Sequence, residues 1–376
     1  MKILILDAGW NQSIYLIGEL SRAGIETTVA APRVPDPRGL GRYCREIESP
    51  AIEHSSYAAF VEQLMQTESF DVVFPACEPA QQIAWALPEK YSRRVFPFTT
   101  PRQRELLADR GALYRLVDSL EIPIPRDVLI PDAAELERAI APLGFPCVLR
   151  GTQGMSGEQV MICGDLQQAQ AAYRRLRARS PGPPFAQQFL DGQRCLIGGL
   201  FDHGRMLQCF SQVTVESCPS PTGPSVRVRS HKDPVLTAYA EQIFRNLEWD
   251  GLACAEFIRL GPGDYRFLEI NPRPWAAIYA AHVCGVPLLK MFVQYVLGRY
   301  SARRIEFADG IECTLFPAFF TARIRAGAFP RAADLKAYWQ ALRTAPWGYP
   351  PLMRSFVRLI WWTYDAQRAA RQGLAR

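Results

Sequence analysis

Apolar and polar positions in the first hundred residues follow an alternating strand and helix rhythm. Short apolar runs predict buried parallel strands: KILILD (residues 2–7), ETTVAA (26–31), DVVFPA (71–76) and VFPF (95–98). Between them lie segments with helical periodicity, such as SIYLIGELSRAG and YAAFVEQLMQ. We therefore predict a small doubly wound α/β domain over residues 1–98. The turn DAGWN after the first run lacks GxGxxG, which argues against a dinucleotide site there.

The pattern changes twice in the middle of the chain. Residues 99–180 carry cap and helix signals in TPRQRELLADRGALYRLVDS and then alternate in PCVLRGTQGMSGEQVMIC, which predicts a hairpin around a glycine-rich tip. The turn residues of SPGPP mark a boundary. Residues 181–312 alternate through FAQQFLDGQRCLIGGLFDHGRMLQCFSQVTVE, which predicts antiparallel sheet, and contain a second hairpin after the helical segment LTAYAEQIFRNL.

The second hairpin, AEFIRLGPGDYRFLEINPRPW at residues 255–275, places polar groups in otherwise apolar strands. A turn centred within GPGD sets Glu256 opposite Glu269, and alternation puts Asn271 on the face of Glu269. Opposed carboxylates repel each other unless a cation neutralises them. Two carboxylates and an amide carbonyl are ligands that Mg²⁺ accepts. The alternative is a surface hairpin with solvated glutamates, but the apolar flanking residues favour one packed face and one cleft face.

Three arginines are candidate partners of phosphate groups. Arg273 continues the alternation past Asn271, where its guanidinium would hold a carboxylate or stabilise charge on a transferred phosphoryl group. Arg150 ends the strand CVLR, and Arg110 lies in the helical segment LADRGALYRL. The alternatives are an ion pair between Arg273 and one of the two glutamates, and a solvated helix surface for Arg110.

The segment RGTQGMSGEQV, at the tip of the first hairpin, has glycines at positions 151, 154 and 157. It has no GK[ST] and is therefore not a P-loop. Glycines at a hairpin tip can bring backbone N–H groups close to phosphates and can hinge as a lid, although many such tips are only loops. Alone, the pattern does not decide between a phosphate-contacting lid and an ordinary loop.

Composition narrows the partners and the compartment. Of the 376 residues, 48% are hydrophobic and 21% are charged, as in globular proteins. The net charge of +6 comes from 43 basic and 37 acidic interspersed residues; it suits an anionic small molecule, and no Lys/Arg-rich block argues for nucleic acid. Ten scattered cysteines without CxxC predict reduced thiols in a cytoplasmic protein. The first apolar run is too short for a signal peptide, and no run approaches the ~20 residues of a membrane span.

Taken in order, these segments resemble the ATP-grasp family of ADP-forming ligases, in particular its carbamoyl-phosphate-synthase-like members. The match runs through ADRGALYRLVDSLEIPIP, FPCVLRGTQGMSGEQV, FAQQFLDG, SPTGPSV and AEFI…FLEINPRP, and it covers residues 1–300 or so. The most specific part is LEINPRP preceded by AEF. The resemblance implies a Rossmann-like pre-grasp domain at residues 1–98 and a two-lobed ATP-grasp domain, with the small lobe at residues 99–180 and the C-terminal lobe and metal site at residues 181–312.

The resemblance also implies roles for individual residues. It implies Mg²⁺ ligation, with Mn²⁺ as an alternative, by Glu256, Glu269 and Asn271, and it places Glu269, Asn271 and Arg273 at the reacting acyl and phosphoryl groups. ATP would lie under the glycine-rich tip and against the strand AQQFL, contacting Arg110, Arg150, Gly154, Ser156, Gly157, Gln187, Gln188, Phe189 and Leu190. Arginine replaces the phosphate-binding lysines of many relatives, which keeps the charge but changes the geometry. The acid that often binds ribose is not evident, because DGQRC offers only an aspartate before the glycine.

The reaction that the resemblance implies is carboxylate activation. The γ-phosphoryl group of ATP passes to a small-molecule carboxylate, and an amine attacks the acyl phosphate to give an amide, ADP and phosphate. Glu78 follows the strand DVVFPAC, where open α/β sheets present ligands, and together with Arg227 and Arg229 it is a candidate substrate contact. Two other functions stay open: a bicarbonate-dependent carboxylase or carbamoyl-phosphate-type enzyme, and a non-catalytic ATP-binding regulator, which would not need the complete set of polar groups in the second hairpin.

Residues 313–376 fall outside the match and are predicted to form a helical extension. In PLMRSFVRLIWWTYDAQRAAR, helical periodicity puts arginines 354, 358, 368 and 371 near one side and Phe356, Ile360, Trp361 and Tyr364 near the other. We expect this helix to pack on its own protein. The alternatives are a homodimer contact and docking on an anionic membrane face.

Overall fold

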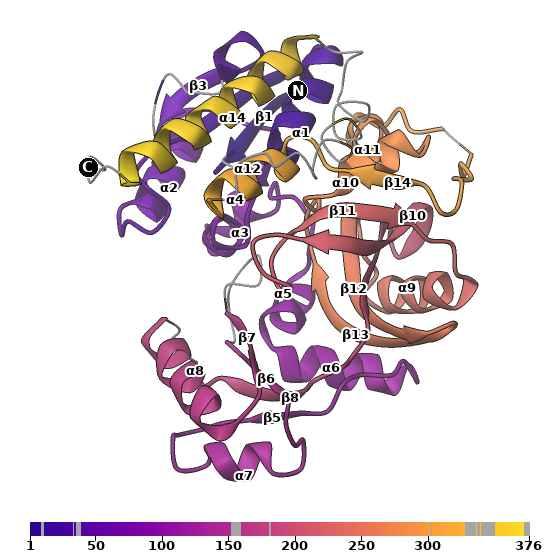
Figure 1. The fold of residues 1–376 in the computed structure, drawn as a ribbon. Coiled ribbons are helices and arrows are strands. Elements are labelled where there is room, and N and C mark those ends of the chain that lie inside the picture. The colour runs from indigo at the N-terminus through magenta and orange to yellow at the C-terminus, as the bar shows by residue number, and fades with distance from the viewer. Residues whose placement is uncertain are drawn as a thin grey trace.

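The computed structural model describes residues 1–8, 11–32, 39–151, 159–179, 182–301, 303–327 and 350–371, together with residues 34, 336 and 339. The strands of these described residues form three sheets: one of four strands at the N-terminus, a second of four strands in the middle and one of six strands. In Figure 1 the N-terminal sheet lies at the top left, the six-stranded sheet at the right and the second four-stranded sheet below. The α/β architecture predicted from the sequence is confirmed.

The N-terminal sheet is parallel, with strand order β3-β2-β1-β4. Successive residues of its first strand enter different cores: Ile3 and Ile5 pack with the first helix, whereas Leu4 and Leu6 pack with the helices on the other face. Burial on both faces explains the continuous apolar runs. The predicted strand at residues 95–98 contributes only an isolated bridge between Val73 and Val95. The elements are β1 (Lys2–Leu6), α1 (Asn11–Arg22), β2 (Glu26–Ala31), η1 (Leu40–Arg42), β3 (Arg45–Glu48), α2 (Tyr57–Thr67), β4 (Val72–Pro75), α3 (Glu78–Trp85) and α4 (Glu89–Ser92).

The middle sheet, which we call the small lobe, has antiparallel strands in the order β5-β8-β6-β7. Two helices lead into it, and the first begins with a capping box between Thr100 and Gln103. Because β8 pairs with β5 and β6, the lobe continues past the predicted boundary at residue 180. The elements are α5 (Pro101–Ala108), α6 (Arg110–Ser119), β5 (Asp127–Leu129), α7 (Leu136–Ile140), β6 (Cys147–Arg150), β7 (Val160–Cys163), α8 (Leu166–Arg179) and β8 (Phe185–Gln188).

The six-stranded sheet is antiparallel, with order β13-β12-β9-β10-β11-β14. One face buries Phe257 and Phe267 against α9 and α6, and the other buries Cys254 with Trp275 and α1 of the N-terminal domain. Two-sided burial makes this sheet the centre of the molecule. Its elements are β9 (Gln193–Asp202), β10 (Arg205–Ser217), β11 (Ser225–Ser230), α9 (Pro234–Asn246), β12 (Gly251–Gly261), β13 (Asp264–Asn271), α10 (Ile278–Val283), α11 (Leu288–Val296) and β14 (Glu312–Thr314).

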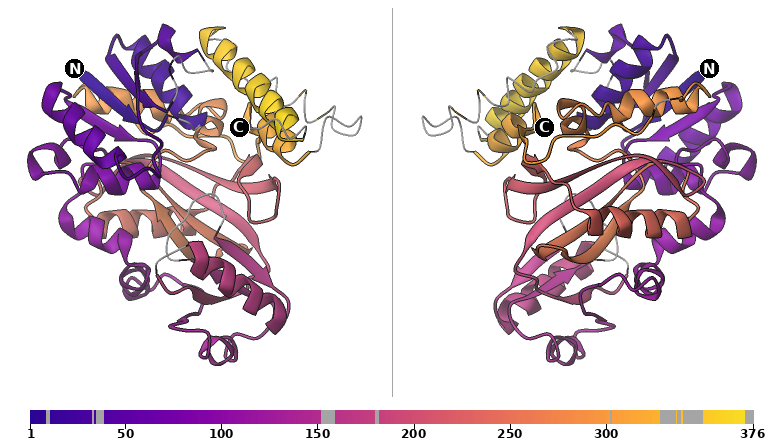
Figure 2. Two further views of the ribbon diagram at one scale, coloured as in Figure 1. Left: turned by 90° about the vertical axis from the view of Figure 1, so that its left-hand side faces the viewer. Right: turned by 90° about the vertical axis from the view of Figure 1, so that its right-hand side faces the viewer.

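The C-terminal segment adds an edge strand, β14, and two helices, α12 (Ala318–Arg325) and α14 (Pro350–Arg371), so it is not purely helical as predicted. Helix α14 lies across the N-terminal domain (Figure 2). Its Phe356 is fully buried, with its ring centroid 4.7 Å from that of Tyr15 on α1. Trp361, predicted on the packed side, is instead 62% exposed. Packing on the chain's own domain leaves the proposed membrane contact without support.

Within the described part of the chain, every helix is too short or too polar to span a bilayer.

Candidate active site

Two carboxylates face each other across β12 and β13. The ladder pairs Glu256 with Glu269 and Cys254 with Asn271, as the spacing around the GPGD turn predicts. The ladder between them and the turn is irregular, with one shift between Glu256 and Phe257 and an opposite one between Arg259 and Gly261. The two shifts cancel, so the predicted pairing of the carboxylates is confirmed although the intervening register is not regular.

Glu256 and Glu269 have different pKa values, because burial, mutual repulsion and nearby arginines act on them to different extents. Burial raises the pKa of Glu256 to about 7, and the charge of Glu269 adds to that rise. Burial also acts to raise the pKa of Glu269, but attraction by Arg150 and the hydrogen bond from it, helped by other arginines, outweigh burial and lower it. The amide Nδ2 of Asn271 donates to Glu256 Oε1 at 3.0 Å. A cation between the carboxylates would favour both ionised forms.

Arg150 reaches the pair from the small lobe. Its Nη2 lies 2.7 Å from Glu269 Oε2, although 119 residues separate them along the chain. The Arg150 side chain is 13% exposed, and attraction by Glu269 keeps its pKa raised against the opposing effect of burial. The end of β6 is therefore held directly against β13, the strand that carries Glu269.

Arg110, at the start of α6, lies in a second network beside Glu269. Its Nη1 donates to the carbonyl of Leu268 at 3.3 Å, and its Nε lies 3.6 Å from Asp127 Oδ2. It also hydrogen-bonds the hydroxyl of Tyr114, one turn further along the helix. That hydroxyl donates to the Leu268 carbonyl at 3.1 Å and accepts from Gln187 Nε2 at 3.0 Å. Leu268 is the extra residue of the bulge, which turns its carbonyl out of the ladder.

Sequence reasoning did not identify Tyr114 or Asp127. The signal for Tyr114 was its spacing of four residues from Arg110 on a helix, which places the two side chains side by side. The position of Asp127, on β5, has no such local signal. Both residues join the predicted nucleotide-binding groups Arg110 and Gln187 into one buried network.

Arg273 joins the carboxylate pair to the N-terminal domain. Its Nη2 lies 3.3 Å from Asn271 Oδ1 and 3.4 Å from Glu78 Oε1. Close by, Gln81 Nε2 donates to the carbonyl of Pro272 at 2.9 Å, so that α3 is fastened to the NPRP turn. Burial raises the pKa of Glu78, against the attraction of Arg273. The structure thus brings Glu78 to the site, next to the groups predicted to react.

The structure does not bring Arg227 and Arg229 to the carboxylates. Both pair with Glu312 on β14, at 3.2 Å and 3.1 Å respectively. Across the paired strands, a continuous row of opposed residues runs from Arg229 to Phe257, so these two side chains lie on the same face of the sheet. Neighbouring residues of a strand point to opposite faces, so Glu256, next to Phe257, lies on the other face. Arg227, two residues before Arg229, shares the face of Arg229.

The remaining predicted nucleotide contacts fall into two groups. Gln187 and Gln188 end β8, and Phe189 and Leu190 follow in the connection to β9, between the small lobe and the six-stranded sheet. The predicted lid contacts lie outside the described residues: Gly154, Ser156 and Gly157.

Three buried guanidinium groups lie around Glu269. The Nε atoms of Arg150 and Arg273 are buried and have no hydrogen-bond acceptor among the described residues, and the buried Nε of Arg110 faces only the Asp127 carboxylate, at 3.6 Å. Buried donors without acceptors are costly, and several arginine donors together match the oxygens of a polyanion such as a phosphate chain. Beside them, Glu256, Glu269 and the Asn271 carbonyl form the oxygen-rich donor set that Mg²⁺ prefers. The residues present therefore fit both a phosphate ester and its metal.

Solved structures share this arrangement of sheets. The biotin carboxylase domain of 2-oxoglutarate carboxylase from Hydrogenobacter thermophilus, in complex with MgADP and bicarbonate, superposes with a TM-score of 0.67 at 15% identity, over 83% of this chain and 73% of that one. N5-carboxyaminoimidazole synthetase from Staphylococcus aureus, complexed with ADP, gives 0.65 at 16% identity, over 81% and 79%. The chain has the ATP-grasp fold. The resemblance inferred from the sequence motifs is confirmed at the level of the fold.

Sequence comparison gives a second likeness. The chain is 26% identical, over 214 residues and 53% of its length, to the carbamoyl phosphate synthase large chain of Rubrobacter xylanophilus. It spans about one fifth of the length of that relative. No family model matches the chain.

Proposed function

We propose that this protein is an ATP-dependent, ADP-forming ligase that activates a substrate carboxylate as an acyl phosphate for attack by an amine. One observation carries the proposal: three buried arginines, two of them with unmatched Nε donors, lie around two opposed carboxylates. That arrangement neutralises a triphosphate and a developing acyl phosphate with fixed charges. The ATP-grasp fold and the likeness to proteins solved with ADP support the same chemistry.

Each group has a defined task in this proposal. Glu256, Glu269 and Asn271 hold Mg²⁺, which when bound neutralises phosphate charge and orients the γ-phosphoryl group. Arg110 and Arg150 bind the phosphates, and the network of Tyr114 fixes the position of Arg110. Gln187 and the three residues after it border the base. Arg273 lies between the metal ligands and the N-terminal domain, where it would hold the substrate carboxylate.

The experiment is ADP release with ATP and Mg²⁺ and a matrix of small carboxylates and amines, followed by mass analysis of condensed products. We expect ADP release that requires both substrates and no turnover in Glu269→Gln. The mass of the product should equal the sum of the masses of the carboxylic acid and the amine minus one water. Exposed Glu137→Gln is the control, since Glu137 lies on α7 in the small lobe. ADP release at background with every pair, or undiminished turnover in Glu269→Gln, would contradict the proposal.

A bicarbonate-dependent reaction is the second candidate, because the relatives include carbamoyl phosphate synthase and the solved neighbours include a biotin carboxylase domain. Its signature is ADP release in buffer with bicarbonate and without any other carboxylate. Degassed, bicarbonate-free buffer separates the two reactions. MgATP binding without ADP release under any condition would indicate a regulator, and Mn²⁺ in place of Mg²⁺ tests the metal preference.

A homodimer is a further proposal, supported by the dimeric state of the biotin carboxylase neighbour. Light scattering of the full chain at several concentrations tests it: a mass near twice 42.3 kDa supports the dimer, and a single-chain mass contradicts it.

A further inference from the structure

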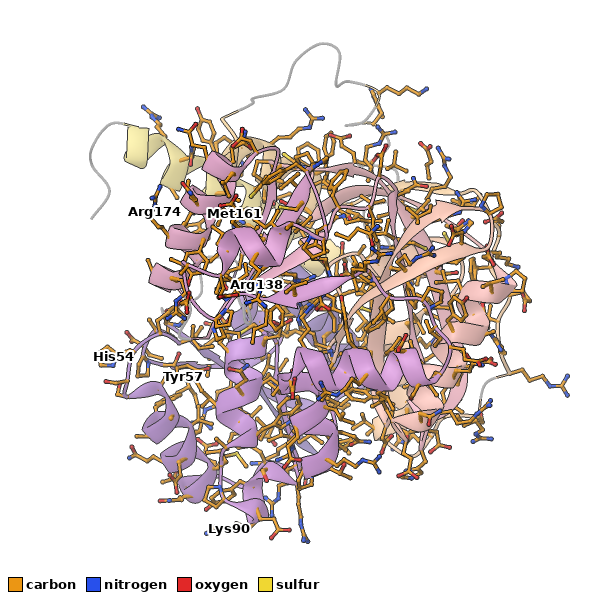
Figure 3. All side chains as sticks on the ribbon, turned by 90° about the horizontal axis from the view of Figure 1, so that it is seen from below. His54, Tyr57, Lys90, Arg138, Met161 and Arg174 are labelled. Atoms are coloured by element: carbon orange, nitrogen blue, oxygen red, sulfur yellow. The ribbon has the colours of Figure 1, made fainter. Side chains whose placement is uncertain are left out.

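One face of α14 packs on its own chain, and the opposite face is exposed. Phe356 and Leu359 are buried, at 0% and 3% exposed, whereas Trp361 is 62% and Trp362 is 44% exposed. No other described helix exposes more than one large apolar side chain. The helix lies on the outside of the molecule (Figure 1, Figure 2), and in Figure 3 one of its ends is visible at the edge, beyond Arg174 of the small lobe. Adjacent exposed tryptophans are typical of a surface that a partner covers.

Charged residues share the exposed face with Trp361. Arg354, Arg358, Trp361, Asp365 and Arg368 are all exposed and follow one another at alternating spacings of four and three residues. That spacing places them in one stripe along the helix, the pattern by which two helices pack lengthwise. Within the described part of the chain, no hydrogen bond or ion pair engages the side chains of the four charged residues. We call the five residues the α14 stripe.

The α14 stripe is complementary to a second copy of itself when the two helices run antiparallel. A two-fold axis that crosses α14 between residues 359 and 360 sets Arg354 opposite the partner's Asp365. The same axis sets Trp361 opposite the partner's Arg358, whose guanidinium is then in position for a cation–π contact. Because a two-fold axis repeats each contact, the pair would contain two ion pairs and two cation–π contacts. The charges of the stripe therefore match those of a second copy.

Other pairings of the stripe bring like charges together. Parallel helices related by a two-fold axis set each arginine opposite its own copy. An antiparallel axis that crosses at Trp361 sets Arg354 opposite the partner's Arg368. An anionic membrane or an acidic protein would repel Asp365, which lies one turn from Trp361, whereas a second copy neutralises it. The single acid of the stripe thus favours a second copy over these other partners.

We propose that α14 pairs antiparallel with α14 of a second copy of this chain through the α14 stripe. The proposal gives the homodimer suggested by the biotin carboxylase neighbour a specific surface, and it does not depend on the ligase activity. Because one helix face is smaller than the about 800 Å² that each partner buries in a standard interface, we expect a reversible dimer with a Kd in the micromolar range. Well below that concentration, Trp361 contributes little to the stability of the single chain.

The test is the mass of the full-length protein by analytical ultracentrifugation between about 0.1 and about 100 μM, a range that brackets the expected Kd. The parent should pass from 42.3 kDa toward twice that mass. Arg354→Asp sets an aspartate opposite Asp365, and Asp365→Arg sets an arginine opposite Arg354, so each should weaken the dimer about tenfold. Combining the two substitutions restores opposite charges with reversed signs and should return the Kd to that of the parent.

Trp361→Ala removes the largest apolar side chain of the stripe and should leave a single-chain mass at every concentration. The matched control is Leu129→Ala. Leu129 is 44% exposed on β5 of the small lobe, so this variant should dimerise like the parent. Circular dichroism shows whether each variant keeps the fold, and Arg354→Asp, which changes only an exposed side chain, carries the test if Trp361→Ala is unfolded.

Three results would overturn the proposal: the parent keeps a single-chain mass at the highest concentration, the dimer is indifferent to Trp361→Ala and Arg354→Asp, or the combined substitutions fail to restore it. Indifference to both variants would assign the dimer to another surface. Vesicles of phosphatidylserine and phosphatidylcholine are the second probe. Cosedimentation that Trp361→Ala abolishes, by a chain with a single-chain mass in solution, would assign the face to an anionic membrane instead.

ADP release is measured separately, so that the two proposals can fail independently. A dimer that depends on the α14 stripe, without ADP release, contradicts the ligase function alone. ADP release by a protein of single-chain mass contradicts the dimer alone.

Discussion

Glu256→Gln should make the metal-free protein more stable while it removes metal binding. The pKa of Glu256 is raised from an ordinary 4.5 to about 7 by burial and by Glu269. At 1.36 kcal/mol per pH unit, that rise corresponds to about 3 kcal/mol of lost stability once the group is ionised. Glutamine keeps the shape and can still accept the hydrogen bond from Asn271, but it carries no charge.

The sign follows from proton linkage. Between pH 4.5 and about 7 the folded protein holds a proton on Glu256 that the unfolded chain has released, so the parent loses stability as pH rises through this window. The advantage of Glu256→Gln should therefore be small at pH 5 and reach about 3 kcal/mol at pH 8. Thermal melts of both proteins in EDTA at the two pH values measure it, as a Tm difference of several degrees that appears only at pH 8.

The same thermal melts repeated with MgADP measure ligand binding separately from the stability of the metal-free protein. MgADP should raise the Tm of the parent through binding to the folded state and should raise that of Glu256→Gln much less. Glu137→Gln, an exposed glutamate on α7, should match the parent in both arms. A variant no more stable than the parent at pH 8 would refute the claim that the buried charge of Glu256 destabilises the metal-free protein. A variant with the full MgADP shift would refute its role in metal binding.

Three further substitutions test the packing of α14, the hydrogen-bond network of Tyr114 and the contact of Arg150 with Glu269. Phe356→Ala, which empties a fully buried position on α14, should cost about 3–5 kcal/mol in urea unfolding, whereas exposed Trp361→Ala should stay within about 0.5 kcal/mol; equal costs would contradict the packing of this helix. Tyr114→Phe should cost roughly 1–3 kcal/mol and weaken ADP binding in calorimetry, because it leaves buried polar partners unmatched; unchanged ADP affinity would separate this network from the nucleotide. Arg150→Lys keeps the charge beside Glu269 but loses the forked geometry, so MgADP should bind about tenfold more weakly, and parent-like affinity would show that charge alone suffices.

Much of the fold could be predicted because its signals are local. Apolar runs and helical periodicity located β1, β2, β4, α1 and α2, and the antiparallel segments came from alternation. The segment at residues 95–98 looked like a strand on composition, but pairing requires a neighbour along its length, and only Val95 has one. The boundary near residue 180 was marked by turn residues, yet β8 returns to the small lobe because its partners β5 and β6 lie there.

What the sequence by itself determined about the site is the opposition of Glu256 and Glu269, because cross-strand pairing near a tight turn depends on spacing alone. Only the tertiary structure decided which distant groups meet that pair. Arg150 reaches Glu269 across 119 residues, and Glu78 reaches Arg273 across 195. The same packing placed Arg229 on the opposite face. Periodicity reports the face of one element, whereas the meeting of elements from different sheets depends on how their buried surfaces fit together, which no local spacing encodes.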